Sequence, residues 1–451
     1  MLLLHISDIH FRAPDCLNPD LDPDRAYRTR LVQDVRARVA ELGPVSAMFI
    51  GGDVAFKGAP EEYRTATAWI GELAAVAGCP LERVFVIPGN HDVDRDVIRR
   101  NAAVRNAQAA ITRAKREDRE RELRTQISDV DTAHALLRPI AAYNDFAKVL
   151  NCQVFLPDRL YWKQDLDLEG GVILRAHGLT STLLSGAAGR DDTRDSLYLS
   201  PLQTVLDPVE NVVNLVLCHH PPDWLMDQDA AEDAICGRAA IQLFGHKHRQ
   251  RIAREVNYIR FSAGAVNPDR NEPSWLPGYN LIDLHIKGAG PDRIVAVDAH
   301  LRQWQSNPDL FRSVSTQQDE AIFRHVIPFP EPRAVAPAVV AAAPVVPSGA
   351  LVADPAAQGA TRTENRCDIL PVTPNADVEA AMGNASTRNL VFRFWNLTTS
   401  QRREIALRIG LIREEELGLP EPERYGRALI RAGQRGQLDE LAREVAEKET
   451  R

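Results

Sequence analysis

The amino-acid sequence predicts a layered α/β fold followed by a small all-helical domain. Short β-rich runs alternate with stretches of helical composition through the first half of the 451-residue chain. Several of these runs are continuously apolar, as in strands that are buried on both faces beneath flanking helices. A stretch rich in proline and alanine then precedes a C-terminal segment with helical periodicity.

The first strands and helices follow one another in a βαβα order. Residues 2–7, 46–52 and 83–89 are apolar runs of strand length. Residues 26–42 and 61–77, which lie between them, have helical composition. This alternation is typical of an α/β fold in which helices pack on a sheet.

A long helical insertion is expected over residues 95–150. Its first thirty residues contain ten Lys or Arg and five Asp or Glu, a local charge of +5 in a chain with a net charge of −8. One interpretation is a cap that reads a phosphodiester backbone. The other is a solvated helical hairpin with ion pairs four residues apart, such as Glu117–Arg121 and Glu120–Arg124.

Six further strand-like runs follow the insertion, at residues 171–178, 211–220, 240–246, 257–264, 279–286 and 293–301. The last three are closely spaced, with turn residues between them. This spacing predicts that the second half of the α/β fold is mostly antiparallel.

Changes in composition divide the chain into three segments. We expect a large α/β domain over residues 1–327, a Pro/Ala-rich linker over residues 328–365 and a helical domain over residues 366–451. The linker has few charges and no periodicity, which is typical of an extended chain. The alternative is a partly ordered arm that lies on the α/β domain.

Composition excludes several classes of protein. No apolar run approaches the ~20 residues that span a bilayer, so no membrane association is expected. The six cysteines are far apart and form no CxxC pair, which favours reduced thiols and a cytoplasmic location over a disulfide framework. The acidic net charge argues against a protein that coats nucleic acid along its whole length.

Five short motifs lie at the ends of strand-like runs: Asp8-Ile9-His10, Gly52-Asp53, Gly89-Asn90-His91-Asp92, His219-His220 and Gly245-His246-Lys247-His248. Each motif alone is typical of a turn or a cap, but their recurrence after strands indicates one shared site. Residues i and i+2 of a strand point to the same side, so the aspartate and histidine of the first motif can face one ion together. The same holds for the two histidines of the last motif. The three glycines would allow sharp turns after the strands.

The chemistry of these side chains points to a metal centre. Asp, Asn and His offer carboxylate and amide oxygens together with imidazole nitrogens, a mixture of ligands that suits Mn, Fe or Zn. Open α/β sheets place their sites at the carboxyl ends of the strands, where these motifs lie.

The motifs resemble those of the calcineurin-like metallophosphoesterase superfamily, whose pattern is D-x-H, G-D, G-N-H-D/E, H and G-H-x-H. The resemblance covers about residues 1–310. It implies a two-sheet sandwich flanked by helices that holds two divalent metal ions, with Mn expected first and Fe or Zn as alternatives. The resemblance assigns Asp8, His10 and His248 to one ion, Asn90, His219 and His246 to the other, and Asp53 to a bridge between them. A carboxylate suits this bridge because its two oxygens can hold two cations ~3.5–4 Å apart.

His91 and Asp92 are the predicted catalytic residues. The resemblance gives His91 no ligand role and implies that it acts as a general acid or phosphate contact that assists the leaving oxygen. Asp92 is expected to orient His91 or a neighbouring imidazole.

Three residues near the motifs leave alternatives open. His220 is an alternative ligand to His219, although the position of Pro221 favours His219. Cys218 is expected to be a buried core thiol rather than a soft ligand. Arg12 could contact a substrate phosphate or be a plain surface arginine.

The C-terminal segment resembles the small death-like or effector-associated helical adaptor domains of bacterial conflict systems. The resemblance rests on short amphipathic helices with mixed surface charge, tethered by the linker. It implies a protein partner that carries a similar domain. The alternative is a helical appendage that stabilises or oligomerises the chain.

Together these features predict a cytoplasmic, dinuclear-metal phosphodiesterase acting on nucleic acid or nucleotides, with a bacterial defence or signalling role as a further hypothesis. The alternatives within the same class are a cyclic-nucleotide phosphodiesterase and a phosphomonoesterase. A different class of function would be a recruited adaptor protein whose metal site is not catalytic.

Overall fold

The computed structural model describes residues 1–194, 196–268 and 276–329, and, near the C-terminus, residues 390, 393–394, 397, 399–413, 416 and 421–449. The chain forms two compact units, Met1–Arg333 and Ala334–Arg451. Apart from its first two residues, the predicted Pro/Ala-rich linker lies outside the described residues.

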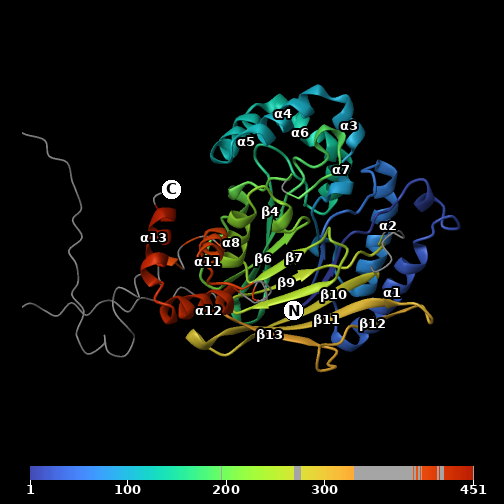
Figure 1. Cartoon of the computed structure of the whole chain (residues 1–451). Helices are drawn as coiled ribbons and strands as arrows, with labels where there is room; N and C mark the ends of the chain where they lie inside the picture. The colour runs from blue at the N-terminus through green and yellow to red at the C-terminus, as the bar shows by residue number, and fades with distance from the viewer. Residues whose placement is uncertain are drawn as a thin grey trace, which may run out of the picture. The chain divides into compact units, whose positions relative to one another are not determined.

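The first sheet has seven strands in the order β12-β11-β10-β1-β2-β3, with β13 paired to β11. Its strands are β1 (Leu2–Ile6), β2 (Ala47–Ile50), β3 (Val84–Val86), β10 (Gly278–Lys287), β11 (Ile294–Gln305), β12 (Leu310–Ser313) and β13 (Phe323–Pro328). Strands β1, β2 and β3 are parallel. The crossover helices between them are α1 (Arg25–Leu42) and α2 (Pro60–Ala77), and right-handed crossovers place both on one face of the sheet (Figure 1).

The second sheet has six strands in the order β4-β5-β6-β7-β9-β8. They are β4 (Trp162–Asp167), β5 (Ile173–Leu179), β6 (Val212–Cys218), β7 (Ile241–Phe244), β8 (Arg251–Glu255) and β9 (Tyr258–Ser262), and helix α8 (Gln228–Arg238) connects β6 to β7. The neighbours β5, β6, β7 and β9 are parallel. The prediction of a mostly antiparallel second half is therefore wrong for the centre of this sheet. It holds for β10 to β13, which are antiparallel neighbours.

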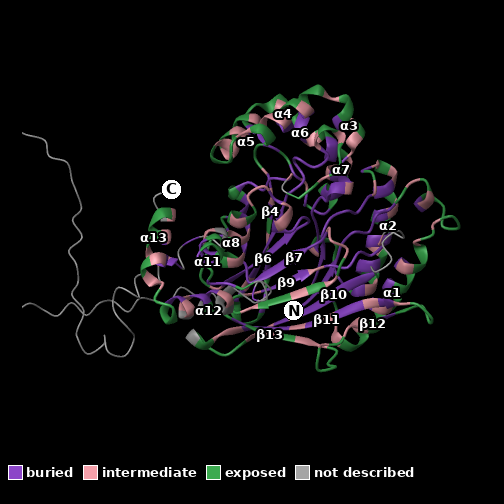
Figure 2. Ribbon diagram, in the orientation of Figure 1, coloured by how far each residue is buried: buried purple, intermediate pink, exposed green. Residues whose placement is uncertain are grey.

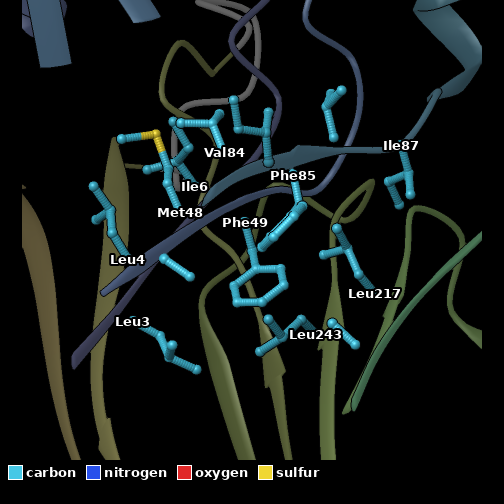
Figure 3. Packing of buried hydrophobic residues seen from close by; sticks show 14 of the residues in the cluster. Leu3, Leu4, Ile6, Met48, Phe49, Val84, Phe85, Ile87, Leu217 and Leu243 are labelled. Atoms are coloured by element: carbon cyan, nitrogen blue, oxygen red, sulfur yellow. The ribbon is translucent and has the colours of Figure 1, made fainter. Parts of the chain in front are cut away.

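The two sheets enclose one apolar core. The face of the first sheet that carries Leu3, Phe49 and Phe85 is directed toward Leu217 and Leu243 of the second sheet (Figure 3). All five side chains are buried. The central strands are buried along most of their length, whereas the outer faces of the helices are exposed (Figure 2). The predicted α/β class, a two-sheet sandwich flanked by helices, is confirmed.

The insertion between β3 and β4 is helical. It consists of α3 (Arg95–Arg100), α4 (Ala102–Arg113), α5 (Arg119–Ser128), α6 (Val130–Leu137) and α7 (Ala141–Val149), and α3 to α6 lie together at the top of Figure 1. Helices α4, α5 and α6 share a small core with residues of the segment 156–198. Of the two expected ion pairs, Glu120–Arg124 is present at 2.8 Å. Arg121 pairs instead with Asp118, at 2.7 Å.

The C-terminal unit is built from α11 (Thr399–Arg408), α12 (Glu421–Gln434) and α13 (Leu438–Glu449). Its buried core includes Phe394, Ile405, Tyr425, Leu441 and Val445. This core confirms a small helical domain. Among the described residues of both units, none of the helices combines the length and the apolar character that crossing a membrane requires.

Trp162 on β4 of the second sheet contacts β3 of the first sheet and so joins the two sheets. Its indole Nε1 donates to the carbonyl of Val86 on β3 (2.8 Å). Its ring covers Gly178 so closely that a Cβ added to Gly178 would lie 1.9 Å from Cε2 of the indole.

Gly178→Ala should therefore overpack this contact and lower the free energy of unfolding by about 1–3 kcal/mol, measured by urea denaturation. Gly71→Ala is the control: nothing lies within 4 Å of its added Cβ, so it should gain roughly 0.5–1 kcal/mol of helix propensity. Unchanged stability of Gly178→Ala would contradict this packing.

Candidate metal centre

The five motifs meet where the two sheets end. Asp8 and His10 follow β1, Asp53 follows β2, and Asn90 follows β3, all in the first sheet. His219 and His220 follow β6, and His246 and His248 follow β7, in the second sheet. Because β1–β2–β3 and β6–β7 are parallel sets, the carboxyl ends within each set lie at one edge.

Left-handed backbone turns these side chains inward. Asp8, His10, Asp53, His246 and His248 have φ between 51° and 67° and make up five of the eleven described non-glycine residues with positive φ. Such conformations are unfavourable for residues with a Cβ and concentrate at functional sites. The expectation that alternation along a strand directs both members of each pair to one ion is therefore wrong, because the strands have already ended. The turned backbone of the loops brings Asp8 and His10 into the same group of ligand atoms, but it places His246 and His248 in different groups.

Close backbone contacts hold the loops in place. The amides of Ile9 and His10 both donate to the carbonyl of Asp53, at 2.9 and 3.0 Å. Gly89 lies so near Asp53 that an added Cβ would be 2.1 Å from Oδ1 and 2.5 Å from the backbone nitrogen. Gly52 has φ +92°, which glycine alone adopts readily. Gly52 thus permits the predicted sharp turn. At Gly89, glycine is needed because any side chain would collide with Asp53.

Asp8, His10, Asp53 and His248 form the first group of converging ligand atoms, all within 4.8 Å of one another. Nε2 of His248 lies 3.1 Å from Oδ1 of Asp8, and Nε2 of His10 lies 3.4 Å from Oδ2 of Asp53. The other ring nitrogen of His10 contacts the carbonyl of Asn267 (3.3 Å). That carbonyl can only accept, so Nδ1 carries the proton and Nε2 is left as the ligand atom.

His219, His220 and His246 form the second group. Oδ1 of Asn90 lies 3.1 Å from Nε2 of His219, 3.2 Å from Nε2 of His220 and 2.9 Å from Nδ1 of His246. Nε2 of His219 also lies 3.2 Å from Oδ2 of Asp53. Asp53 thus contacts histidines of both groups, which is the arrangement expected of a bridging carboxylate.

Electrostatics make this a site for cations. Asp8 and Asp53 are almost fully buried. Burial raises the pKa of Asp53, but the charges of His219 and His91 outweigh it and hold that pKa well below its usual range. Burial lowers the pKa of His219, but Asp53 and Asp8 reverse this and raise it to about 9. Two ionised carboxylates in a buried site require positive charge nearby, and the surrounding carboxylate, amide and imidazole donors fit a divalent metal.

His91 lies beside the first group. Its backbone amide donates to Oδ1 of Asp53 (2.7 Å), and its ring lies 4.8 Å from that of His10. The Nδ1–H group of His91 donates to the carbonyl of Phe56 (2.9 Å), and the two rings stack at 5.0 Å. These contacts fix the ring and leave Nε2 as the atom that can exchange a proton.

Asp92 differs from its predicted role. Oδ1 accepts from the amide of Ala55 (2.9 Å) and the hydroxyl of Tyr63 (2.8 Å), and Oδ2 accepts from the amide of Gly89 (2.9 Å). No hydrogen bond joins it to an imidazole of the described residues. Burial and the charge of Asp53 raise the pKa of Asp92 to about 6. Asp92 therefore joins the loops after β2 and β3, and acts on the site only through them.

Two aromatic neighbours of the site, Phe56 and Trp224, were not predicted. Phe56 stacks on His91. The guanidinium of Arg12, which was expected either to contact a substrate phosphate or to lie on the surface, is exposed and lies 3.7 Å above the ring of Phe56. The ring of Trp224 stands edge-on to His246 at 4.0 Å. The sequence around an aromatic residue does not show whether the side chain will lie beside a functional site or in the hydrophobic core. Cys218 is a buried thiol whose pKa burial raises to about 12, in agreement with the expected core role.

Fold and site together define a two-sheet α/β protein with a candidate metal centre where its two sheets end. Residues 1–250 match the family model of the calcineurin-like phosphoesterases, and the chain belongs to this family. Residues 386–447 match the model of the GTPase-associated adaptor domain. Both predicted resemblances, to the phosphoesterases and to a small helical adaptor domain, are confirmed.

Comparison with solved structures gives distant matches. Vps29 of Chaetomium thermophilum is 10% identical, with a TM-score of 0.27 over 73% of this chain and 98% of that one. A protein named as a 5'-nucleotidase from Staphylococcus aureus is 12% identical, with a TM-score of 0.31 over 72% of this chain and 54% of that one. An uncharacterized protein of Streptococcus pneumoniae, named as a predicted phosphoesterase, is 14% identical, with a TM-score of 0.26 over 72% of this chain and 97% of that one. No curated protein sequence matches the chain.

The position of Asp53 predicts how the chain loads with metal. Metal-free protein that is saturated with Mn²⁺ and desalted should retain two ions per chain by elemental analysis. Asp53→Asn should retain at most one, because the amide offers a single oxygen where both groups need one. Asp165→Asn, which alters a half-exposed ion pair with Arg175 (2.7 Å), is the control and should retain two. Retention of two ions with unchanged affinity by Asp53→Asn would contradict the bridge.

Proposed function

We propose that the chain is a dinuclear-metal phosphodiesterase. The observation that carries this proposal is the position of Asp53, whose carboxylate contacts histidines of both ligand groups, His10 in the first and His219 in the second. We assign Asp8, His10 and His248 to one ion and Asn90, His219 and His246 to the other. Mn is our first choice of metal, with Fe or Zn as alternatives, because the ligands are oxygen and imidazole without a thiolate.

The side chains around the two ions have separate roles in this proposal. When bound, the ions would polarise the phosphoryl group and lower the pKa of a water molecule. His91 moves a proton at Nε2 to the leaving oxygen, and Phe56 holds the ring by its carbonyl and its stacked side chain. Asp92 keeps the loops that carry Asp53 and Asn90 at a fixed separation.

The contacts of the insertion favour a nucleotide over a polymeric nucleic acid as substrate. Arg116 and Arg119 pair with Asp227 at 3.2 and 3.3 Å, and Arg95 pairs with Asp191. Arginines that are paired with carboxylates of the same chain contribute less to a phosphate-binding surface. Arg113 and Lys115 form no ion pair with the residues that the structure describes. If the substrate is a polymeric nucleic acid, these two side chains are therefore the ones expected to contact its phosphates.

Activity assays separate these substrates. With Mn²⁺, the chain should hydrolyse bis(p-nitrophenyl) phosphate, and His91→Ala should lower kcat by about 10²–10⁴ because the proton donor is lost. His134→Ala changes an exposed histidine of α6 and should leave kcat unchanged. Absence of hydrolysis of mono- and diesters with any divalent metal would overturn the proposal.

The same assay on plasmid, single-stranded DNA, RNA and cyclic nucleotides identifies the substrate class. Arg113→Gln combined with Lys115→Gln should lower hydrolysis of polymers alone if the insertion reads a backbone. Preference for monoesters would instead support the phosphomonoesterase alternative. Full cellular function of Asp53→Asn would revive the adaptor alternative, in which the metal site is not catalytic.

We further propose that the C-terminal domain recruits a protein partner in a bacterial defence or signalling system. The match to an adaptor model and the compact helical core support this role. A tether raises the effective concentration of an enzyme at its partner without new contacts. A cytoplasmic location fits the five described cysteines, all of which are free thiols.

Recruitment and catalysis should be separable. Phe394 is fully buried in the C-terminal core, and Phe394→Ala should destabilise that core by about 3–5 kcal/mol. The immobilised full-length variant should lose a partner that carries a related domain, while its hydrolysis of bis(p-nitrophenyl) phosphate stays unchanged. Equal partner retention by the variant and the wild-type chain would contradict recruitment through this domain.

A further inference from the structure

His219 and His220 are adjacent, and Nε2 of each lies near the same oxygen of Asn90, at 3.1 and 3.2 Å. Distances alone would allow both to bind one ion. We propose that only His219 is a ligand, and that His220, oriented by Ser181, positions Asn90 for metal binding. This inference rests on the proposed two-metal function and identifies a residue that acts through a ligand.

The ring of His219 is oriented by a backbone carbonyl. Its Nδ1 lies 2.7 Å from the oxygen of Gly51. A carbonyl oxygen can only accept a hydrogen bond, so Nδ1 carries a proton. In the neutral ring, Nε2 therefore presents a lone pair toward Asn90 and Asp53, as a metal ligand must.

The ring of His220 has the opposite arrangement. Its Nδ1 lies 2.8 Å from the hydroxyl oxygen of Ser181, which also accepts the backbone amide of His220 at 3.5 Å. That amide can only donate, so it occupies a lone pair of the hydroxyl oxygen, and we assign the hydroxyl proton to Nδ1 of His220. The thiol of Cys218 is directed to the carbonyl of His220 (3.3 Å). With Nδ1 as the acceptor, the proton of the neutral His220 ring is on Nε2, which faces Oδ1 of Asn90.

This donor decides which end of the Asn90 amide faces the metal. Oδ1 has two lone pairs, so it can accept from Nε2–H of His220 and still offer the other lone pair to the ion that His219 and His246 would hold. If the amide were reversed, its NH₂ group would face the N–H of His220, and two donors would oppose each other. All three partners are buried: Ser181 and His220 are 0% exposed and Asn90 is 6% exposed. Water is therefore a poor substitute for either hydrogen bond.

A similar pair outside the metal centre serves as an internal control. Nε2 of His177 on β5 lies 3.0 Å from Oδ1 of Asn214 on β6, and both side chains are buried. The amide of Asn214 donates to the carbonyls of Leu206 and Arg238, each at 3.2 Å. The His177–Asn214 pair therefore has the same chemistry as His220–Asn90 but joins only structural elements.

Calorimetric titration of the metal-free, full-length chain with Mn²⁺ tests the proposal without any measurement of activity. The wild-type chain should show two sites. His220→Ala should weaken one of them by about 10–100-fold and leave the other unchanged, as loss of a residue that orients a ligand does. His220→Gln should recover most of that affinity, because its amide NH₂ can replace the donor. Ser181→Ala should weaken the same site by less than His220→Ala, and His177→Gln should change neither site.

Two results would overturn the role of His220 while leaving the proposed function intact. Unchanged Mn²⁺ affinity at both sites in His220→Ala would show that Asn90 does not need the hydrogen bond from His220 to bind the ion. An equal loss in His220→Gln and His220→Ala, with no effect of Ser181→Ala, would show that His220 binds the ion itself. If the wild-type chain bound no ion, the proposed function would fail together with this inference. If His220→Ala fails to fold, the Mn²⁺ affinities of Ser181→Ala and His220→Gln still test the proposal. Ser181→Ala should weaken one site, whereas His220→Gln should keep most of its affinity.

Discussion

The structure depends on two ionised carboxylates, Asp8 and Asp53, that are buried where the sheets end. A buried charge is costly unless it is paired, and among the described residues the ion-pair partners of these two are imidazoles rather than lysine or arginine. A neutral imidazole is a metal ligand, and a protonated one is a counter-ion. Asp53 and Asp8 raise the pKa of His219 to about 9, so these carboxylates favour a positive charge at this position. The site is therefore built to hold positive charge.

The fold supplies the precision that such a site needs. Strands of both sheets end at the site, so its geometry depends on how the sheets are joined. Trp162 and Tyr143 both donate to the carbonyl of Val86, the last residue of β3 before the loop that carries Asn90. Asp92 then joins this loop to the one that carries Asp53. The strained backbone at the candidate ligands persists because these surrounding contacts hold the loops in place.

The sequence predicts the α/β class and the site residues because both depend on short-range chemistry. Short apolar runs such as residues 46–52 favour buried strands, and clusters of Asp, Asn and His directly after such runs favour metal binding. The edge strands β4, β8, β12 and β13 were missed because they contain polar and exposed residues that dilute the apolar pattern. The parallel centre of the second sheet was also missed, since strand direction depends on pairing rather than on local sequence. The role of Asp92 and the contribution of Ser181 could not be predicted, because both depend on contacts between distant segments.

In the proposed function, the carboxylate of Asp53 joins two metal ions where the two sheets end. The most direct test is anomalous diffraction from crystals of the chain grown with Mn²⁺, collected above and below the Mn absorption edge. Two anomalous peaks are expected ~3.5–4 Å apart, with an oxygen of Asp53 within ligand distance of each. A single peak, or two peaks of which only one contacts Asp53, would contradict this role of Asp53.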